Sequence, residues 1–403
     1  MMGIRNWLPF TRATKPKGQV ALDSPEFLEF VRTGMGGNSV ETALQNDAVL
    51  RAVDLVTGSI AMLPLEMMRR SESNGKIGPA LDHPLYNLLR YQTNPWQTAH
   101  EFKALMQGWL LMHGNAYAQI VRTLGRVSSL IPIDPRNVSI ETDGGMFPLR
   151  YRVTTQRNES VVLQPGDILH LRGFSVDAEK GVSRIQKAGA IIQTANQQQI
   201  AAQSLYEKGV IAGVAFKHPG QITAEAFARL KASLDTYAGA QNAGRAVLLE
   251  EGMSREFPPA TAQSSQMFEM GGQLTERIGR VFGVPRPLMF MDDTSWGSGI
   301  EQLAMLFVRF GLAPWFSVWE QGITRACLPI QDRGVFYPDF DERELLRGTL
   351  KDQGEFLARA LGSGGHRPWM EVNEARDHVG LGRHEQGSGL IAAGESNVPS
   401  QTA

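Results

Sequence analysis

Cysteine is nearly missing from this sequence, because Cys327 is the only one among 403 residues. A single cysteine excludes a disulfide within the chain and any zinc site built from several thiolates. It is also consistent with a reducing compartment such as the cytosol. We therefore expect Cys327 to be a small, buried apolar residue.

A surplus of charge of one sign is missing as well. The 40 Lys and Arg residues balance the 41 Asp and Glu residues, which leaves a formal net charge of -1 at pH 7. Proteins that hold nucleic acid tightly neutralise its phosphates with a cationic surface. The balance argues against such a protein, and any contact with DNA is expected to be loose or transient.

Long hydrophobic runs are also missing. The most apolar stretches, residues 109–112 and 303–310, are far shorter than the roughly 20 residues that cross a bilayer as a helix. The first residues carry scattered charges and lack the apolar segment of a signal peptide. The sequence predicts a soluble protein.

The motifs of several common enzyme classes do not occur. The only Gly-Lys pair, Gly75-Lys76, lacks the following Ser or Thr of a phosphate-binding P-loop. There is no Gly-x-Ser-x-Gly nucleophile elbow, and His384-Glu385 lacks the second histidine of a zincin helix. Asp292-Asp293 could bind a divalent ion, but adjacent acids in a loop rich in Pro and Gly are usually only solvated. We predict no catalytic residue, no metal, no cofactor, and a protein that is not an enzyme.

The residues that are present indicate an α+β protein with two or three sub-regions. Apolar side chains fall on one helical face from Glu41 to Ile60, and Pro64 ends that helix. A strand is predicted at 65–70, and the Thr98-x-x-Glu101 capping box starts a helix that reaches His113. Short strands are then predicted at 116–122, 127–133, 138–142, 149–154, 161–163 and 168–171.

The next part of the chain has the pattern of an inserted tip. Between Ser183 and Lys208 the composition changes to Ala and Gln with almost no charge, which favours a long helix with a polar, uncharged face. A strand at 213–216, a helix at 223–237 and a strand at 246–250 predict a small α/β unit. An amphipathic helix follows at 266–282, so the small unit lies between two helices.

Pro and Gly in the residues that follow predict a loop up to residue 299. A helix resumes at Ile300 and is expected to bend at Pro314, and further helices are predicted at 341–361 and 369–379. Four tryptophans with apolar neighbours are predicted to lie in the core: Trp96, Trp109, Trp315 and Trp319.

Several short segments are weak signals singly but specific as an ordered set. They are residues 41–64, His83-Pro84-Leu85-Tyr86, Asn94-Pro95-Trp96-Gln97-Thr98, His113-Gly114-Asn115-Ala116-Tyr117, Ile131-Pro132-Ile133-Asp134-Pro135, Asp167-Ile168-Leu169-His170-Leu171-Arg172-Gly173, Phe282-Gly283-Val284-Pro285 and Val372-Asn373-Glu374-Ala375-Arg376. In this order they resemble the phage portal proteins of the Hong Kong 97 type, across residues 40–380.

The resemblance implies the portal fold with a wing, stem helices, an α/β clip and a C-terminal helical crown. The implied parts are a flexible N-terminal arm (1–40), an α+β wing (41–182), a first stem helix (183–210), the clip (211–264), a second stem helix (265–284), a tunnel loop (285–299), a kinked wing helix with a following strand (300–340), the crown (341–386) and a disordered tail (387–403).

The resemblance also implies a function. Such subunits form a closed ring, expected to be a dodecamer, at one capsid vertex of a phage or prophage particle, and double-stranded DNA passes through it during packaging and ejection. The implied partners are the terminase large subunit, the head-tail adaptor, the major capsid protein and the scaffold protein, with no membrane. The ring would assemble in the cytoplasm of the host bacterium and remain in the virion.

By the same resemblance, five residues of the tunnel loop are expected to face the DNA: Asp292, Asp293, Thr294, Ser295 and Trp296. The sequence departs from its relatives here, because Trp296-Gly297-Ser298-Gly299 precedes Ile300-Glu301-Gln302 where relatives tend to carry Ser-Asn. Two other readings remain open. A different ring-forming head-tail connector would lack the unit between two helices, and a hydrolase would need a site that assembles only in the fold.

Overall fold

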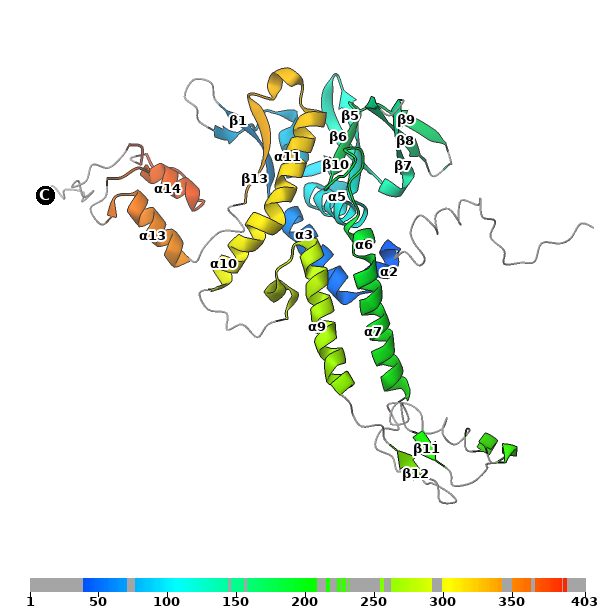
Figure 1. Ribbon diagram of the computed structural model, residues 1–403. Coiled ribbons are helices and arrows are strands. Elements are labelled where there is room, and N and C mark those ends of the chain that lie inside the picture. Colours follow the sequence, from blue (N-terminus) through cyan, green and yellow to red (C-terminus); the bar gives the residue numbers. More distant parts are fainter. Residues whose placement is uncertain are drawn as a thin grey trace, which may run out of the picture.

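The computed structural model describes residues 39–70, 77–143, 146–155, 157, 159–208, 215–217, 223–225, 227–229, 231, 254–256, 262–291, 299–342, 350–363, 367–385 and 387–389. Most of their helices and antiparallel strands form one body, from which a pair of long helices projects (Figure 1). The predicted α+β class is confirmed. No helix in these ranges is long and apolar enough to cross a membrane.

The helices of the body and the projecting pair follow one another along the chain. They are α2 (Val40–Leu44), α3 (Asp47–Met62), α4 (Pro84–Arg90), α5 (Ala99–His113), α6 (Arg184–Lys187), α7 (Gly189–Lys208), α9 (Ala262–Phe282), α10 (Gly299–Leu306) and α11 (Ala313–Cys327). Shorter turns are η1 (Pro135–Asn137), η4 (Arg286–Met289) and η6 (Ile330–Asp332), and the π-helical η5 (Phe307–Leu312) joins α10 to α11.

Three antiparallel sheets of three strands complete the body, in the orders β13-β1-β2, β10-β5-β6 and β7-β8-β9. The strands are β1 (Leu65–Arg70), β2 (Ile77–Pro79), β5 (Asn115–Thr123), β6 (Arg126–Ile133), β7 (Val138–Asp143), β8 (Met146–Thr154), β9 (Ser160–Leu163), β10 (Ile168–Arg172) and β13 (Phe336–Phe340), with a two-stranded pair of β3 (Gln92–Asn94) and β4 (Gln97–Thr98). The strands predicted between 116 and 171 are therefore all present. Because β1 pairs with β13, segments far apart in the sequence share a sheet.

Two helices, not one, occupy the first predicted helical stretch. Asn46 separates α2 from α3, and its side chain accepts a hydrogen bond from the backbone N–H of Val49 at 3.3 Å. This bond satisfies a free amide of the first turn of α3, so the chain restarts a helix there. The predicted continuous helix is wrong at Asn46, whereas its apolar face and its end before Pro64 are confirmed.

Helix α5 begins and ends where the sequence predicts. The Thr98 hydroxyl accepts from the Glu101 N–H, and the Glu101 carboxylate accepts from the Thr98 N–H at 2.8 Å, which completes the capping box. Gly114 ends the helix in the left-handed region with φ 78°. A carbon added to it would lie 2.5 Å from the backbone of Val182, so only glycine fits.

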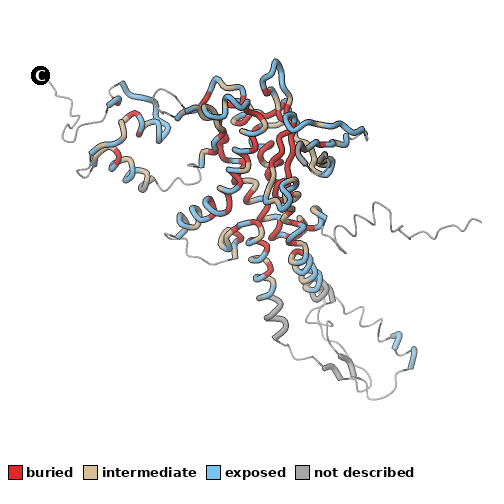
Figure 2. The backbone as a smooth tube through the Cα atoms, turned by 45° about the horizontal axis from the view of Figure 1, so that its top comes forward, coloured by how far each residue is buried: buried red, intermediate tan, exposed pale blue. Residues whose placement is uncertain are grey.

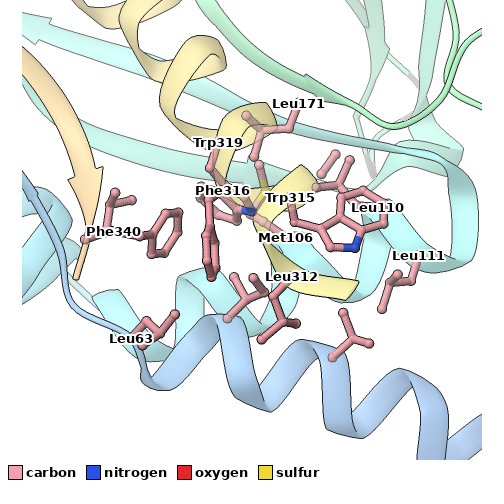
Figure 3. Packing of buried hydrophobic residues seen from close by; sticks show 14 of the residues in the cluster. Leu63, Met106, Leu110, Leu111, Leu171, Leu312, Trp315, Phe316, Trp319 and Phe340 are labelled. Atoms are coloured by element: carbon pink, nitrogen blue, oxygen red, sulfur yellow. The ribbon is translucent and has the colours of Figure 1, made fainter. Parts of the chain in front are cut away.

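The core lies where α3, α5 and α11 meet β10 and β13 (Figure 3). Trp319 is fully buried, and its indole N–H donates to Oε1 of Gln107 at 2.9 Å. Its ring meets Phe102 edge-on, with the ring centroids 6.2 Å apart. Losing a buried aromatic side chain of this kind costs about 3–5 kcal/mol of folding free energy. Around it pack Leu63, Met106, Leu110, Leu171, Leu312, Phe316 and Phe340.

The projecting pair consists of α7 and α9, which lie side by side (Figure 1). They approach closely, since a carbon added to Gly271 would lie 3.3 Å from the amide nitrogen of Gln198. The predicted single helix from Ser183 is wrong in one detail, because Ala188 ends the short α6 before α7 begins. Burial is concentrated in the body and decreases along the described parts of both helices with distance from the body (Figure 2).

Little of the predicted unit between α7 and α9 is described. β11 (Ala215–Lys217) pairs antiparallel with β12 (Ser254–Glu256), and residues 224–225, 227–229 and 231 are helical. β11 overlaps the strand predicted at 213–216, and the helical residues fall within the helix predicted at 223–237. The strand predicted at 246–250 lies outside the described residues, and β12 was not predicted.

The chain ends are also described in part. The predicted arm lies outside the described residues except for Ser39 and Val40, which begin α2. Each helix predicted after residue 340 overlaps an observed one, α13 (Leu350–Ala360) or α14 (Val372–His378), but residues 341–342 and 369–371 are not helical. The predicted tail begins with Gly387, whose carbonyl accepts from the Asn373 N–H at 2.9 Å, and residues 390–403 lie outside the described residues.

The helix after residue 299 differs from its prediction. A π-helical stretch, η5, interrupts it before Pro314, and Pro314 itself lies in the first turn of α11. A proline there costs little because its missing N–H would have no partner within the helix. The irregularity therefore begins at η5 and not at Pro314 as predicted.

Two predictions for single residues have opposite outcomes. Cys327 is buried as predicted, and burial raises the pKa of its thiol to about 12. Trp315 and Trp319 are buried and Trp109 is half-buried, but Trp96 is 62% exposed. Trp96 lies in the turn between β3 and β4 and not on a helix, so its predicted place in the core is wrong.

Candidate functional site

The five residues predicted to face DNA, Asp292 to Trp296, lie outside the described residues. The structure does describe both sides of their segment, as far as Met291 before it and from Gly299 after it. The candidate site consists of the described residues on the two sides of this segment, which we call the two anchors.

The first anchor is the turn that follows α9. Gly283 has φ 76°, and the Val284 N–H donates to the Gly279 carbonyl at 2.9 Å. The flanking side chains of Phe282 and Val284 are buried, at 0% and 5% exposure. A glycine in the left-handed region ends the helix, and buried apolar side chains on each side of it fix the turn. These two requirements explain the sequence Phe282-Gly283-Val284-Pro285.

The second anchor comes from η5, which packs directly on that turn. A carbon added to Gly311 would lie 2.8 Å from the Gly283 carbonyl oxygen, closer than real contacts allow. The neighbouring Phe307, Val308 and Leu312 are buried in the core. The helix that follows the segment is therefore fixed against the helix that precedes it.

Arg51 of α3 supports the chain between these anchors. Its Nε and Nη2 donate to the Leu288 carbonyl of η4 at 3.3 and 3.2 Å, and its guanidinium lies 4.7 Å from the centre of the Phe290 ring. Phe290 has φ 56°, in the left-handed region that side chains with a β-carbon rarely adopt. A residue held in such a conformation marks a segment whose direction is set by its surroundings.

Several apolar side chains of this region are exposed in the single chain. Phe290 is 73% exposed, and on α10 and η5 Met305, Leu306 and Phe310 are 56%, 52% and 67% exposed. Arg286 lies 3.5 Å from the Glu276 carboxylate, which also pairs with Arg280, and the guanidinium of Arg309 lies 5.7 Å from the centre of the Phe310 ring. The anchors therefore present mainly aromatic and aliphatic surface.

Helix α7 adds a long face without charge. From Gly189 to Tyr206 the chain contains no Asp, Glu, Lys or Arg. At its base Arg184 donates to the Val281 carbonyl at 2.9 Å and lies 4.7 Å from the centre of the Trp315 ring. Burial lowers the pKa of Arg184, and these contacts join the base of α7 to α9 and α11.

The described residues of this region offer few groups that could bind a metal ion. In the described part of the chain, no three His, Cys, Asp or Glu side chains are grouped so that they could hold a metal ion. The anchors supply buried glycines, stacked arginines and apolar surface. Such an arrangement can position a segment and offer it to a partner.

Comparison with known proteins identifies the family. The sequence profile of phage portal proteins matches residues 47–380. The portal protein of Enterobacteria phage HK97 is 30% identical over 351 residues, which cover 85% of this chain and 80% of that protein. The chain belongs to the phage portal protein family.

Solved structures agree with this membership at the level of the fold. A chain from the neck of a native gene transfer agent (GTA) particle, computed with C12 symmetry, matches 89% of this portal protein and 94% of its own length, with a TM-score of 0.57 and 20% identity. An HK97-family portal protein from Corynebacterium diphtheriae matches 77% of this chain and 97% of its own length, with a TM-score of 0.55 and 18% identity. The predicted portal fold is thereby confirmed.

The sequence pointed to the loop of this portal protein but not to what holds it. Phe282-Gly283-Val284-Pro285 forms a motif in the sequence, whereas Arg51 and Gly311 have no distinctive neighbours there. Arg51 is one of several arginines in the sequence, and its carbonyl partner Leu288 is 237 positions away. Only the fold brings these groups together, so no local signal could have found them.

Proposed function

We propose that this portal protein forms a closed ring at one capsid vertex and that double-stranded DNA passes through the ring during packaging and ejection. The observation that carries the proposal is family membership across residues 47–380. The C12 symmetry of the related GTA neck supports a ring of twelve copies for this chain. The predicted DNA-facing residues Asp292, Asp293, Thr294, Ser295 and Trp296 would line the narrowest part of the channel.

The parts of the portal fold are assigned in the same proposal. Residues 41–182 and 300–340 form the wing, α7 and α9 the stem, 211–264 the clip, 285–299 the tunnel loop and 341–386 the crown. The pairing of β1 with β13 supports a wing made from both sides of the stem and clip. The contacts of η4 and η5 with α3 support a tunnel loop that starts and ends on the wing.

The partners follow from these parts. The clip would dock the terminase large subunit during packaging and the head-tail adaptor afterwards, and the major capsid and scaffold proteins would surround the wing. The ring would assemble in the host cytoplasm and stay at the portal vertex of the virion. This role requires no chemistry of the chain itself.

The charge pattern is consistent with transport of DNA. A lining rich in Lys and Arg would hold phosphates and release counterions, and every step of the DNA would then have to break these contacts. The uncharged stretch of α7 and the two acids of the tunnel loop avoid such contacts. DNA could then slide instead of binding.

The experiment changes the chemistry of the loop without changing its length. The variant carries Asp292→Gly, Asp293→Ser, Thr294→Gly and Trp296→Gly, with Ser295 kept. We expect normal rings by electron microscopy, because the two anchors are untouched, and particles with reduced DNA content. A control with Glu72→Gly, Ser73→Gly and Asn74→Ser, between β1 and β2, should package normally.

Two results would contradict the assignment. Normal DNA content and titre in the loop variant would remove the loop from the channel. Loss of rings in the loop variant, with rings kept in the control, would give the loop a role in assembly instead.

A further inference from the structure

A cavity at the end of the body far from α7 and α9 is not explained by the channel. It is open to solvent, has a volume of about 500 Å³ and is lined by the β5–β6 hairpin, the start of α4 and the chain between α11 and β13. The labelled elements β5, β6 and α11 lie in the upper part of Figure 1, opposite the projecting helices. Five arginines line it: Arg69, Arg122, Arg126, Arg325 and Arg333. We call it the arginine pocket.

Positive charge exceeds negative charge in this pocket. Two carboxylates, Asp82 and Asp332, line the pocket with the five guanidinium groups. Asp82 is paired with Arg69 at 2.6 Å, and Arg122 is paired with Asp167, just outside the lining, at 3.5 Å. Three carboxylates therefore stand against five guanidinium groups. Burial lowers the pKa of His83 in the wall, which favours the neutral form, so the positive charge of the pocket comes from its arginines alone. In a chain with a net charge of -1, such a local surplus indicates a site for an anionic group.

The arginines are held in place by the backbone. Arg122 donates to the Gly166 carbonyl at 2.8 Å, and Arg333 donates to the Arg325 carbonyl at 2.9 Å. Arg325 in turn donates to the carbonyl of His170 at 2.8 Å. Each guanidinium has five N–H donors, so these bonds fix its position and leave donors for a ligand. The guanidinium of Arg126 has no ion-pair or hydrogen-bond partner among the described residues.

Apolar side chains form another part of the wall, and together with the arginines they indicate the class of ligand. Leu328, Pro329 and Phe336 line the pocket, and Ile330 at its edge is 80% exposed. Duplex DNA presents phosphates on a convex surface and has no apolar side group to fill a concave, partly apolar pocket. A peptide with carboxylates and apolar side chains matches both parts of the wall, and arginine binds carboxylates with two parallel hydrogen bonds.

We propose that the arginine pocket is a docking site for an acidic segment of a partner protein that also carries an apolar side chain. The carboxylates of the segment would lie on Arg126 and its neighbours, and its apolar side chain on Ile330 and Phe336. The site is separate from the tunnel loop and does not depend on the channel assignment.

The test measures binding of labelled short probes to the purified full chain by fluorescence anisotropy at low salt. The probe is a peptide of alternating glutamate and leucine. Two comparison probes are used: the same peptide with glutamine in place of glutamate, and a short duplex DNA. We expect the acidic peptide to bind best. Arg126→Glu should weaken it by about tenfold or more, the loss expected for one charge-assisted contact.

Matched variants separate this site from general charge effects. Arg157→Glu makes the same charge change on an exposed residue between β8 and β9 and should leave binding unchanged. Ile330→Ser should weaken the acidic peptide severalfold, because Ile330 contributes apolar contact. The proposal is overturned if the acidic peptide does not bind, if Arg157→Glu weakens it as much as Arg126→Glu, or if duplex DNA binds better and Arg126→Glu abolishes that binding.

Discussion

At the scale of single residues, His170 shows how a polar group is placed inside this body. Its side chain is 2% exposed and lies between Asn115 and Tyr151. Asn115 Oδ1 already accepts from the Gly181 N–H at 2.8 Å, so it also accepts from Nε2 of His170 at 3.0 Å. Nδ1 is then free to accept from the Tyr151 hydroxyl at 3.1 Å. This network requires a neutral imidazole with its proton on Nε2.

The neutral imidazole makes stability depend on pH. Burial, together with Arg172 and Arg325, lowers the pKa of His170 to about 3 from an ordinary value of 6.5. Because the folded pKa is the lower one, the contribution of His170 is complete above pH 6.5 and is lost as the pH falls toward 3. We expect the melting temperature of the wild type to fall over this range and that of His170→Gln to fall less steeply. His100→Gln, on the exposed first turn of α5, is the control and should keep the wild-type slope.

At the scale of elements, Arg184 joins the stem to the body. It is a half-buried cation whose contacts are the Val281 carbonyl and the Trp315 ring, with no carboxylate partner among the described residues. Arg184→Met keeps most of the side-chain volume but leaves the carbonyl without its donor. We expect a loss of about 1–3 kcal/mol in unfolding free energy, measured by thermal denaturation.

Lys187→Met is the matched control for this prediction. Lys187 lies one helical turn further along α6 and is exposed, so its replacement should change the melting temperature little. An equal effect of the two substitutions would mean that Arg184 does not join these elements.

The elements themselves were largely predictable from the sequence because their signals are local. The capping box of α5, the left-handed Gly114 and the alternating strands from 116 to 171 each depend on neighbouring residues. The breaks at Asn46 and Ala188 were missed because the apolar face continues across each break, so the period gave no warning. The π-helical η5 was missed because it fits around the Gly283 turn, which only the tertiary structure supplies.

The candidate site was less predictable for the same reason. The sequence indicated a loop after Phe282-Gly283-Val284-Pro285, but the residues expected to face DNA rest on family resemblance and remain a prediction. The arginine pocket could not be predicted from the sequence because its five arginines come from separate segments between Arg69 and Arg333. An overall charge balance conceals such local surpluses, since it reports only their sum.

At the scale of the whole molecule, charge is distributed unevenly although its sum is close to zero. The arginine pocket collects positive charge at one end, while α7 at the other end is free of charge from Gly189 to Tyr206. If α7 faces the channel of the proposed ring, this division keeps cationic groups away from the path of the DNA. Cationic groups placed on α7 should then bind the phosphates of the DNA and slow its passage through the ring.

Gln193→Lys with Gln197→Lys tests this idea, because both side chains are exposed and lie one turn apart on α7. Each new phosphate contact should make the binding of DNA to the ring steeper in salt, by about 0.9 in the slope of log K against log salt concentration. We expect rings that bind DNA more tightly at low salt and package it more slowly. Gln193→Glu with Gln197→Glu is the control of opposite sign and should show neither effect. If both pairs of substitutions abolish ring formation, this face of α7 contacts a neighbouring subunit, and unchanged DNA binding by intact lysine-bearing rings would place it outside the channel.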